Sequence, residues 1–316
     1  MILRALKFIA ENLSGKRIPL SLAHMVTFRC NMRCHYCDYW RRSSEELALN
    51  EIFRMLEEAA GMGIPSYTAT GGEPLLRKDI AEILKFASEL DLYTILFTNG
   101  LLLREKKIEA DRIFVSLDTL SREKFMRITG VDALPRILDV LRWAAENHEI
   151  SLNTVIHGEN LDEIEDLVRF ADELGVGISF EPVSPYFDGC PSLSREALRK
   201  SAEKLLRLKR EYRCILNSRK YLEMILRGER FECRPHLLLR VNPDGSVISP
   251  CYEIEHVRAG DVRDGIGNVI RSELYSEGLK RARDCRGCYL SCYAETSMAL
   301  SLRNLPAYLP TILRLL

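Results

Sequence analysis

Residues 20–37 read LSLAHMVTFRCNMRCHYC, and this stretch decides the fold. Its first half, Leu20–Phe28, is short and largely apolar, as a buried parallel strand should be. Its second half places Cys30, Cys34 and Cys37 in a CxxxCxxC spacing directly after that strand. Because a loop at the end of a strand is free to fold around a metal site, thiolates this close in sequence can converge on one centre.

The sequence beyond this loop repeats the same strand-like pattern. Amphipathic helical periods separate the repeats; one is Ile52, Met55, Leu56 and Ala59. The further strand candidates are Tyr67–Thr70, Thr94–Thr98, Ile113–Leu117, Leu152–Ile156 and Ile178–Val183. Six strand–helix repeats predict an α/β fold with a parallel sheet and helices outside it. Since a closed barrel needs eight repeats, we expect an open, partial (β/α)6 TIM-like barrel.

Composition narrows the class of protein. Lys and Arg number 45, and so do Asp and Glu, so no basic surplus points to a nucleic-acid partner. The ten cysteines fall largely into two close groups, which suits metal ligation better than a disulfide framework. No secretory signal opens the chain, and no run of about 18 uncharged apolar residues occurs. We therefore expect a protein of the reducing cytoplasm.

Changes in character along the chain suggest its organisation. We expect an N-terminal helical segment (1–19), a core (20–190), a charged helical linker (191–230), a small cysteine-rich hairpin and helix module (231–295) and an apolar tail (296–316). Within the module, Leu238–Val241 and Val247–Ser249 flank a Pro-Asp-Gly turn and predict a β-hairpin.

The spacing of the first three cysteines leaves two kinds of metal site open. One is a [4Fe–4S] cube, in which three protein thiolates leave the fourth iron free for a small molecule. The other is a zinc knuckle that takes a fourth ligand such as His35 or His24. The spacing alone favours iron–sulfur only modestly.

The same segment resembles the signature CxxxCxφC of the radical S-adenosylmethionine (SAM) superfamily, with Tyr36 at the aromatic position. The resemblance implies that Cys30, Cys34 and Cys37 bind a [4Fe–4S] cluster, that SAM chelates the open iron, and that Tyr36 lies against the adenine. It also implies reductive cleavage of SAM to a 5′-deoxyadenosyl radical, which abstracts hydrogen from a substrate. The protein then has to position the reacting atoms, since the cofactor supplies the chemistry.

Further segments match the superfamily in the expected order, after successive strands. A GGEP-like motif, which in that family holds the SAM amino group, follows the second strand; the glycines would let the backbone approach the ligand, and a carboxylate suits an ammonium group. The other matches follow the third and fourth strands or lie on the fifth, where a structural asparagine is an equally good interpretation. The implied SAM-pocket residues are Gly71, Gly72, Glu73, Pro74, Thr98, Asn99, Ser116, Asp118 and Asn153.

A second cysteine group lies in the last third of the chain. Taken alone it fits a cluster or a structural zinc site equally well. It is similar to the SPASM/twitch extensions of radical SAM enzymes, which implies one auxiliary [4Fe–4S] cluster active in electron transfer. The expected ligands are Cys233, Cys251, Cys285 and Cys288, with Cys292 as a possible substitute. Cys190 and Cys214 match no motif.

The substrate is left open as a small molecule, a lipid or a peptide, and a reductant such as ferredoxin or flavodoxin is expected. Because so few residues precede the first strand, we expect no N-terminal peptide-recognition domain. Apolar ends suggest a membrane-surface contact, although packing across the open barrel is the favoured interpretation. Glu181, Tyr186 and Asp188 are positional candidates for substrate contacts. The competing hypothesis is a non-catalytic zinc-binding or iron–sulfur electron-carrier protein.

Overall fold

One continuous nine-stranded sheet organises the computed structural model. The structure describes residues 8–12, 14–184, 189–249, 251, 257–282, 285, 288–301 and 308. The strands are β1 (Ser21–Thr27), β2 (Ser66–Gly71), β3 (Tyr93–Thr98), β4 (Arg112–Ser116), β5 (Ile150–Ile156), β6 (Gly177–Pro182), β7 (Leu238–Val241), β8 (Ser246–Ile248) and β9 (Arg258–Asp261).

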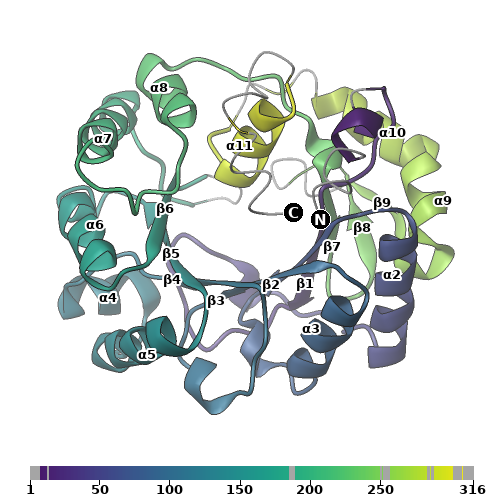
Figure 1. Ribbon diagram of the computed structural model, residues 1–316, viewed down its shortest axis with the longest axis horizontal. Coiled ribbons are helices and arrows are strands. Elements are labelled where there is room, and N and C mark those ends of the chain that lie inside the picture. The colour runs from purple at the N-terminus through teal and green to yellow at the C-terminus, as the bar shows by residue number, and fades with distance from the viewer. Residues whose placement is uncertain are drawn as a thin grey trace.

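Strands β1 to β6 are parallel and lie side by side in chain order. Figure 1 shows the helices arranged around the outside of this curved sheet. The partial-barrel prediction is therefore confirmed, and every predicted strand end lies within two residues of the observed one. The apolar runs locate the strands well because the residues of β1 to β6 are buried or only partly exposed.

The helices bury the predicted apolar stripes against the sheet. In the first of them, Ile52, Met55, Leu56 and Ala59 are all buried. The helices are α2 (Leu49–Gly61), α3 (Ile80–Glu89), α4 (Arg122–Thr129), α5 (Leu134–Asn147), α6 (Ile164–Glu173), α7 (Arg195–Leu208), α8 (Arg219–Arg227), α9 (Ile266–Arg271), α10 (Glu273–Arg281) and α11 (Ser291–Ala299). Serine hydroxyls cap the N-termini of α4, α7, α8 and α10.

The predicted hairpin forms between β7 and β8, and it also extends the core sheet. β7 pairs with β8 antiparallel, and on its other side it pairs with β1 parallel. The expected boundary at residue 230 is therefore crossed by backbone pairing. The helical linker is the pair α7 and α8, which packs on β6 and α6.

The described parts of both chain ends pack onto the body of the protein. Phe8 and Ile9, in the helical residues 8–12, are buried with Leu237 and Leu300. Tyr308 donates a hydrogen bond from its hydroxyl to Glu295 at 2.9 Å. These contacts agree with packing of the ends; most of the apolar stripe and the tail lie outside the described residues. Among the described helices, none has the length and apolar character needed to cross a membrane.

Candidate functional site

The cysteine loop after β1 is held in place by the end of α4. The Arg33 N–H donates to the carbonyl of Thr129 at 2.8 Å, and the His35 N–H donates to the carbonyl of Ile128 at 2.9 Å. Within the loop, the Cys37 N–H donates to the carbonyl of Cys34 at 3.1 Å, which closes a turn between two of the thiols. The backbone of the loop is thus fixed by its neighbours.

The three thiols form a partly buried group. Burial raises the pKa of Cys34 well above its usual value and that of Cys37 to about 11, and each is raised further by the nearby Cys30. Desolvated thiols next to one another favour a positively charged partner that keeps them as thiolates. A soft iron site supplies one, so the donor set fits an iron–sulfur cluster.

The zinc alternative finds less support in this arrangement. Among the described residues, no three His, Cys, Asp or Glu side chains are gathered as the cage of a single ion. Zinc needs all its sulfur ligands at about 2.3 Å from one point, whereas a four-iron cube takes each cysteine on a separate iron. Each of the two proposed histidine ligands has one ring nitrogen beside a polar neighbour: His24 Nδ1 lies 3.0 Å from the Tyr67 hydroxyl, and His35 Nε2 lies 3.4 Å from Glu159.

Gly71 and Gly72 serve the packing of the cysteine loop. A Cβ on Gly71 would lie 2.3 Å from the carbonyl oxygen of Thr27, and one on Gly72 would lie 2.2 Å from that of Arg29. The Gly72 N–H donates to Thr27, and the Glu73 N–H donates to Arg29, both at 2.7 Å. The close approach that requires glycine here is to the backbone just before Cys30, which no local motif indicates.

Glu73 is a buried carboxylate that joins the ends of β2 and β3. It accepts hydrogen bonds from the Thr98 hydroxyl and the Asn99 N–H, both at 2.7 Å, and from the Leu75 N–H at 3.0 Å. Burial raises the pKa of Glu73 to about 6 although these donors favour the anion. The Asn99 side chain donates to Asn31 at 2.7 Å and so continues the network to the cysteine loop. Pro74 is buried directly after Glu73.

Tyr36 and Asp118 form a second cross-link at this edge. The Tyr36 hydroxyl donates to Asp118 Oδ2 at 2.5 Å, and the Val155 N–H donates to Asp118 Oδ1 at 2.9 Å. Burial raises the pKa of Asp118 to about 6. Ser116 and Asn153 are register partners on β4 and β5, and Asn153 Oδ1 accepts from the Ser179 hydroxyl at 2.8 Å. All the predicted pocket residues therefore lie at or near one edge of the sheet.

Three residues near Tyr36 or inside the barrel were missed by sequence reasoning. The buried His157 has its ring centroid 5.4 Å from that of Tyr36, and Cys190 Sγ lies 3.5 Å from the Tyr36 carbonyl. The buried Arg240 on β7 donates to the Tyr39 hydroxyl at 2.7 Å. Only the position of His157, directly after β5, could have signalled a role.

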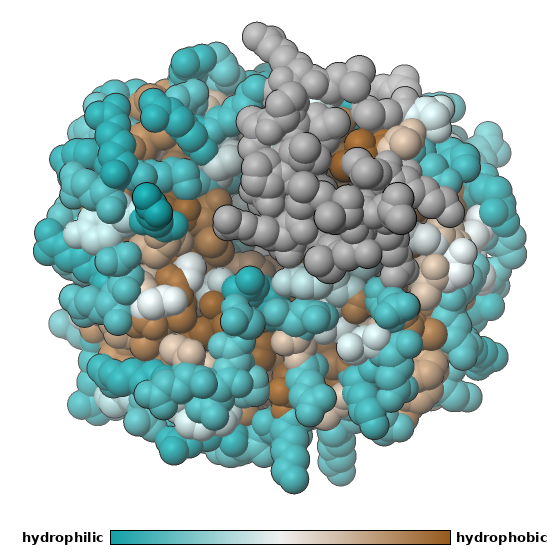
Figure 2. Space-filling model, viewed as in Figure 1, coloured by the Kyte–Doolittle hydropathy of each residue, from teal (hydrophilic) through white to brown (hydrophobic). Residues whose placement is uncertain are grey.

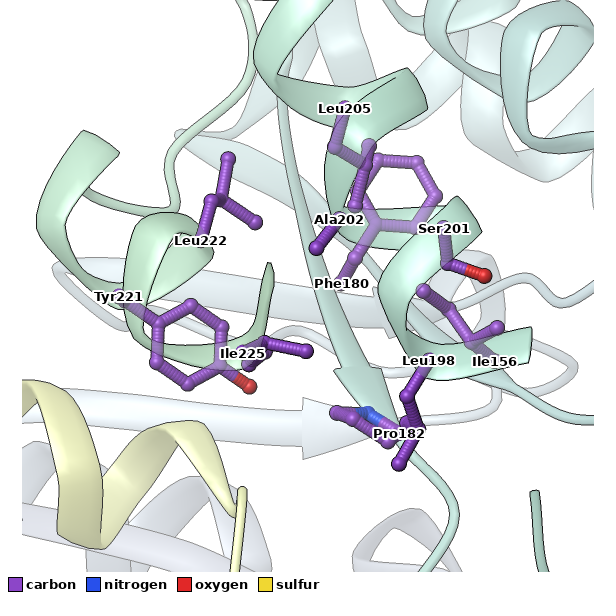
Figure 3. A pocket seen from close by; sticks show the side chains of 10 residues that line it. All are labelled: Ile156, Phe180, Pro182, Leu198, Ser201, Ala202, Leu205, Tyr221, Leu222 and Ile225. Atoms are coloured by element: carbon purple, nitrogen blue, oxygen red, sulfur yellow. The ribbon is translucent and has the colours of Figure 1, made fainter. Parts of the chain in front are cut away.

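The enclosed cavity between β6, α7 and α8 is a packing gap. Its lining is almost entirely apolar, and its free volume of about 10 Å³ is far below that of a cofactor (Figure 3). In the view of Figure 2, apolar side chains gather left of the middle of the face, where Figure 1 labels β4 to β6. The polar and thiol side chains suited to binding a cofactor lie instead at the ends of the strands.

The second cysteine group converges in space. Burial raises the pKa of Cys233 to about 12, and the neighbouring Cys288, Cys251 and Cys285 raise it further. Burial raises the pKa of Cys292 well above its usual value, and the charges of Glu181, Cys288 and Cys233 raise it further. All five cysteines thus lie within electrostatic reach of the group. Cys214 lies apart, with its Sγ 3.6 Å from the carbonyl of Val168.

Glu181, on β6, connects the two groups. Its Oε2 accepts from the Ser291 hydroxyl at 3.0 Å, next to Cys292 at the start of α11. Burial raises the pKa of Glu181, while hydrogen bonds from Ser291 and Asn153 act in the opposite direction. The residue proposed for substrate contact therefore bridges a SAM-pocket candidate and the second cysteine group. Tyr186 and Asp188 lie outside the described residues.

A six-stranded parallel partial barrel with a CxxxCxxC loop after its first strand defines a class of cofactor-dependent barrel enzymes. Residues 25–171 match the family model described as Radical SAM superfamily, and residues 183–307 match a domain of unknown function (DUF3463). The chain therefore contains a radical SAM domain, followed by a second, C-terminal domain. The cofactors of that superfamily are SAM and a [4Fe–4S] cluster.

Curated relatives carry two kinds of name. The chain is 34% identical over 178 residues to GTP 3′,8-cyclase of Clostridium perfringens, covering 52% of this chain and 55% of that one. It is 28% identical over 302 residues to PqqA peptide cyclase of Bradyrhizobium diazoefficiens, covering 86% and 79%. The chain thus spans about half the length of the first of these relatives.

Solved structures share the fold. SuiB of Streptococcus suis bound to S-adenosylmethionine superposes with a TM-score of 0.71 at 20% identity, covering 86% of this chain and 71% of that one. The protein named anSMEcpe, with bound AdoMet and a peptide, gives a TM-score of 0.65 at 20% identity and covers 88% of both chains.

Proposed function

We propose that this enzyme cleaves SAM reductively at a [4Fe–4S] cluster held by Cys30, Cys34 and Cys37 and abstracts hydrogen from an organic substrate. Its auxiliary cluster would exchange one electron during the reaction. The observation that carries the proposal is the pair of cross-links at the strand ends, Glu73 to Thr98 and Asn99, and Tyr36 to Asp118. They support the proposal because they bring together, beside the cysteine loop, residue types that the superfamily uses to bind its cofactor.

The residues of the chain have positioning roles in this proposal. Glu73 and Asn99 brace the loop through Asn31, so the thiols keep their spacing when the cluster is bound. Tyr36 is anchored by Asp118 and presents its ring toward His157, which leaves an aromatic wall for an adenine. Burial of these groups excludes water, and a reactive radical requires this exclusion.

The auxiliary cluster is proposed for Cys233, Cys251, Cys285 and Cys288. Their support is the mutual electrostatic influence centred on Cys233. Cys292 faces Glu181 and is the substitute ligand should one of the four be free. A cluster with four cysteine ligands has no open iron, so electron transfer suits it better than substrate binding.

The substrate classes are a small molecule, a lipid or a peptide. Peptides gain support from the relative named PqqA peptide cyclase and from SuiB solved with the precursor peptide SuiA. The relatives named GTP 3′,8-cyclase support a small molecule instead.

Anaerobic reconstitution tests the proposal. The protein should bind about eight irons and form 5′-deoxyadenosine from SAM and dithionite. Cys34→Ala should lower the iron content to about four and abolish 5′-deoxyadenosine, whereas Cys233→Ala should lower iron alone. Cys214→Ala is the matched control and should change neither quantity. Bound zinc without 5′-deoxyadenosine would favour the non-catalytic alternative. An iron content that is unchanged in Cys233→Ala would contradict the proposed auxiliary cluster.

A further inference from the structure

The charge of this neutral chain is unevenly distributed. Residues 195–230, the segment of α7 and α8, contain twelve Lys and Arg against five Asp and Glu, a net charge of +7. The rest of the chain therefore carries −7, since the two totals are equal. We call residues 195–230 the basic helix pair. Figure 2 shows hydrophilic side chains over the upper left of the molecule, where Figure 1 places α7 and α8.

Helix α8 has an exposed charged face and a buried apolar face. Arg219, Lys220 and Arg227 are exposed on its outer face, with Glu223 as the acidic residue among them. The inner face is buried and consists of Tyr221, Leu222, Met224 and Ile225. Leu222 and Ile225 line the packing gap against β6 and α7 (Figure 3). On the outer face Arg219 pairs with Glu223 at 2.8 Å and Arg227 pairs with Glu229 at 3.6 Å. The positive charge of the segment is therefore the excess of its Lys and Arg residues over these carboxylates.

The inner side of α8 contacts the segment that bears the auxiliary cysteines. The Tyr221 hydroxyl donates to the carbonyl of Tyr289 at 2.5 Å, one residue from Cys288. The Ser218 N–H donates to Glu295 of α11 at 2.8 Å. A helix is roughly 10 Å across, so a partner on the outer face would lie about one helix thickness from this segment.

Resting on the proposed auxiliary cluster, we propose that the basic helix pair is the docking surface for an acidic one-electron carrier protein of the flavodoxin or ferredoxin class. Docking would bring the carrier's redox group close enough to exchange one electron with the auxiliary cluster; one partner is oxidised and the other reduced by that electron, and no bond changes. Charge complementarity of this kind speeds encounter and selects the partner.

The surface chemistry disfavours other anionic partners. A membrane-binding helix needs an exposed apolar face, but the apolar face of α8 is buried. Binding of single-stranded nucleic acid relies on exposed aromatic rings, and the exposed large apolar residues of the described chain are Met126, Leu216 and Leu274. A folded acidic protein requires neither feature. Leu216, 48% exposed between α7 and α8, can add an apolar contact to such an interface.

Calorimetric titration of the reconstituted holoenzyme with oxidised flavodoxin tests the surface. The double variant R219E/R227E should bind about tenfold more weakly at low salt, and the wild-type affinity should fall as salt is raised. The matched control K85E/R104E changes the net charge equally, on exposed ion-paired residues of α3 and of the turn after β3, and should stay within about twofold.

Equal weakening in both variants, or in neither, would overturn the proposal, as would salt-independent binding. Binding of the wild type, but not of R219E/R227E, to phosphatidylglycerol vesicles without flavodoxin binding would assign the surface to a membrane. Iron counting separates this inference from the proposed function. If the reconstituted protein binds only about four irons, the proposed auxiliary cluster is absent. The titration still reports whether the carrier docks on the basic helix pair.

Discussion

His24 shows what a buried titratable residue costs this fold. It lies on β1 with no exposed surface, and its Nδ1 is paired with the Tyr67 hydroxyl. Its Nε2 has no hydrogen-bond partner among the described residues. Burial lowers the pKa of His24 to about 3, with Arg77 adding to the effect. The imidazole is therefore neutral in the folded protein near pH 7.

The pH dependence of stability follows from this residue. Because the unfolded chain binds a proton near pH 6.5 and the folded chain does so only near 3, stability is full above pH 6.5 and falls as pH drops toward 3. At pH 5 the loss from His24 should be about 2 kcal/mol. His24→Asn keeps a polar group beside Tyr67 without this titration, so its free energy of unfolding should fall less between pH 7 and pH 5.

Urea denaturation at the two pH values measures this difference. All other carboxylates and histidines are common to both proteins, so the difference between their losses of stability reports His24 alone. Equal losses in wild type and His24→Asn would show that His24 titrates normally in the folded protein.

At the scale of elements, the junction between β1 and β2 decides where the cysteine loop lies. The turn after β2 is stacked on the backbone of Thr27–Arg29 by two hydrogen bonds and by two glycines. A methyl group at Gly72 would overlap the carbonyl oxygens of both Phe28 and Arg29, which belong to the backbone and cannot rotate away. Cys30, the first cysteine of the loop, follows directly after this contact.

Gly72→Ala should therefore destabilise the protein by about 1–3 kcal/mol and displace the loop. We expect its reconstituted form to lose iron of the first cluster. Gly61→Ala at the end of α2 has open space around the new methyl group and should be neutral or slightly stabilising. Chemical denaturation and iron content measure both variants. Normal stability and normal iron in Gly72→Ala would mean that the loop tolerates a shift at this contact.

The sequence predicted the elements better than their connections. Apolar runs such as Ile113–Leu117 locate strands because every second residue is fully buried and the residues between are only partly exposed. The pairing of β7 with β1 could not be predicted, since a hairpin has the same local signals whichever sheet it joins. The link from Glu181 to Ser291 joins positions 110 residues apart, and no local pattern encodes it. The roles of the SAM-pocket and auxiliary residues stay predictions.

At the scale of the molecule, the C-terminal third is built into the barrel. β7 covers the open edge of β1, and its Leu239 and Val241 are completely buried. Farther along, the N–H groups of Ile266 and Gly267 donate to the Glu58 carboxylate of α2, both at 2.8 Å. This carboxylate lies at the start of α9, where the helix dipole favours negative charge. The two cysteine groups are therefore held in one scaffold.

Removing residues 231–316 should consequently unfold the remaining barrel instead of releasing a stable domain. The truncation exposes the edge of β1, which then has no strand to pair with the residues that bind β7 in the full chain. We expect fragment 1–230 to be insoluble, or to elute as an aggregate without cooperative thermal unfolding, while the full chain unfolds in one transition. Size-exclusion chromatography and calorimetry distinguish the cases. A monomeric 1–230 fragment with its own sharp transition would contradict this, because it would show that the barrel closes its edge without β7.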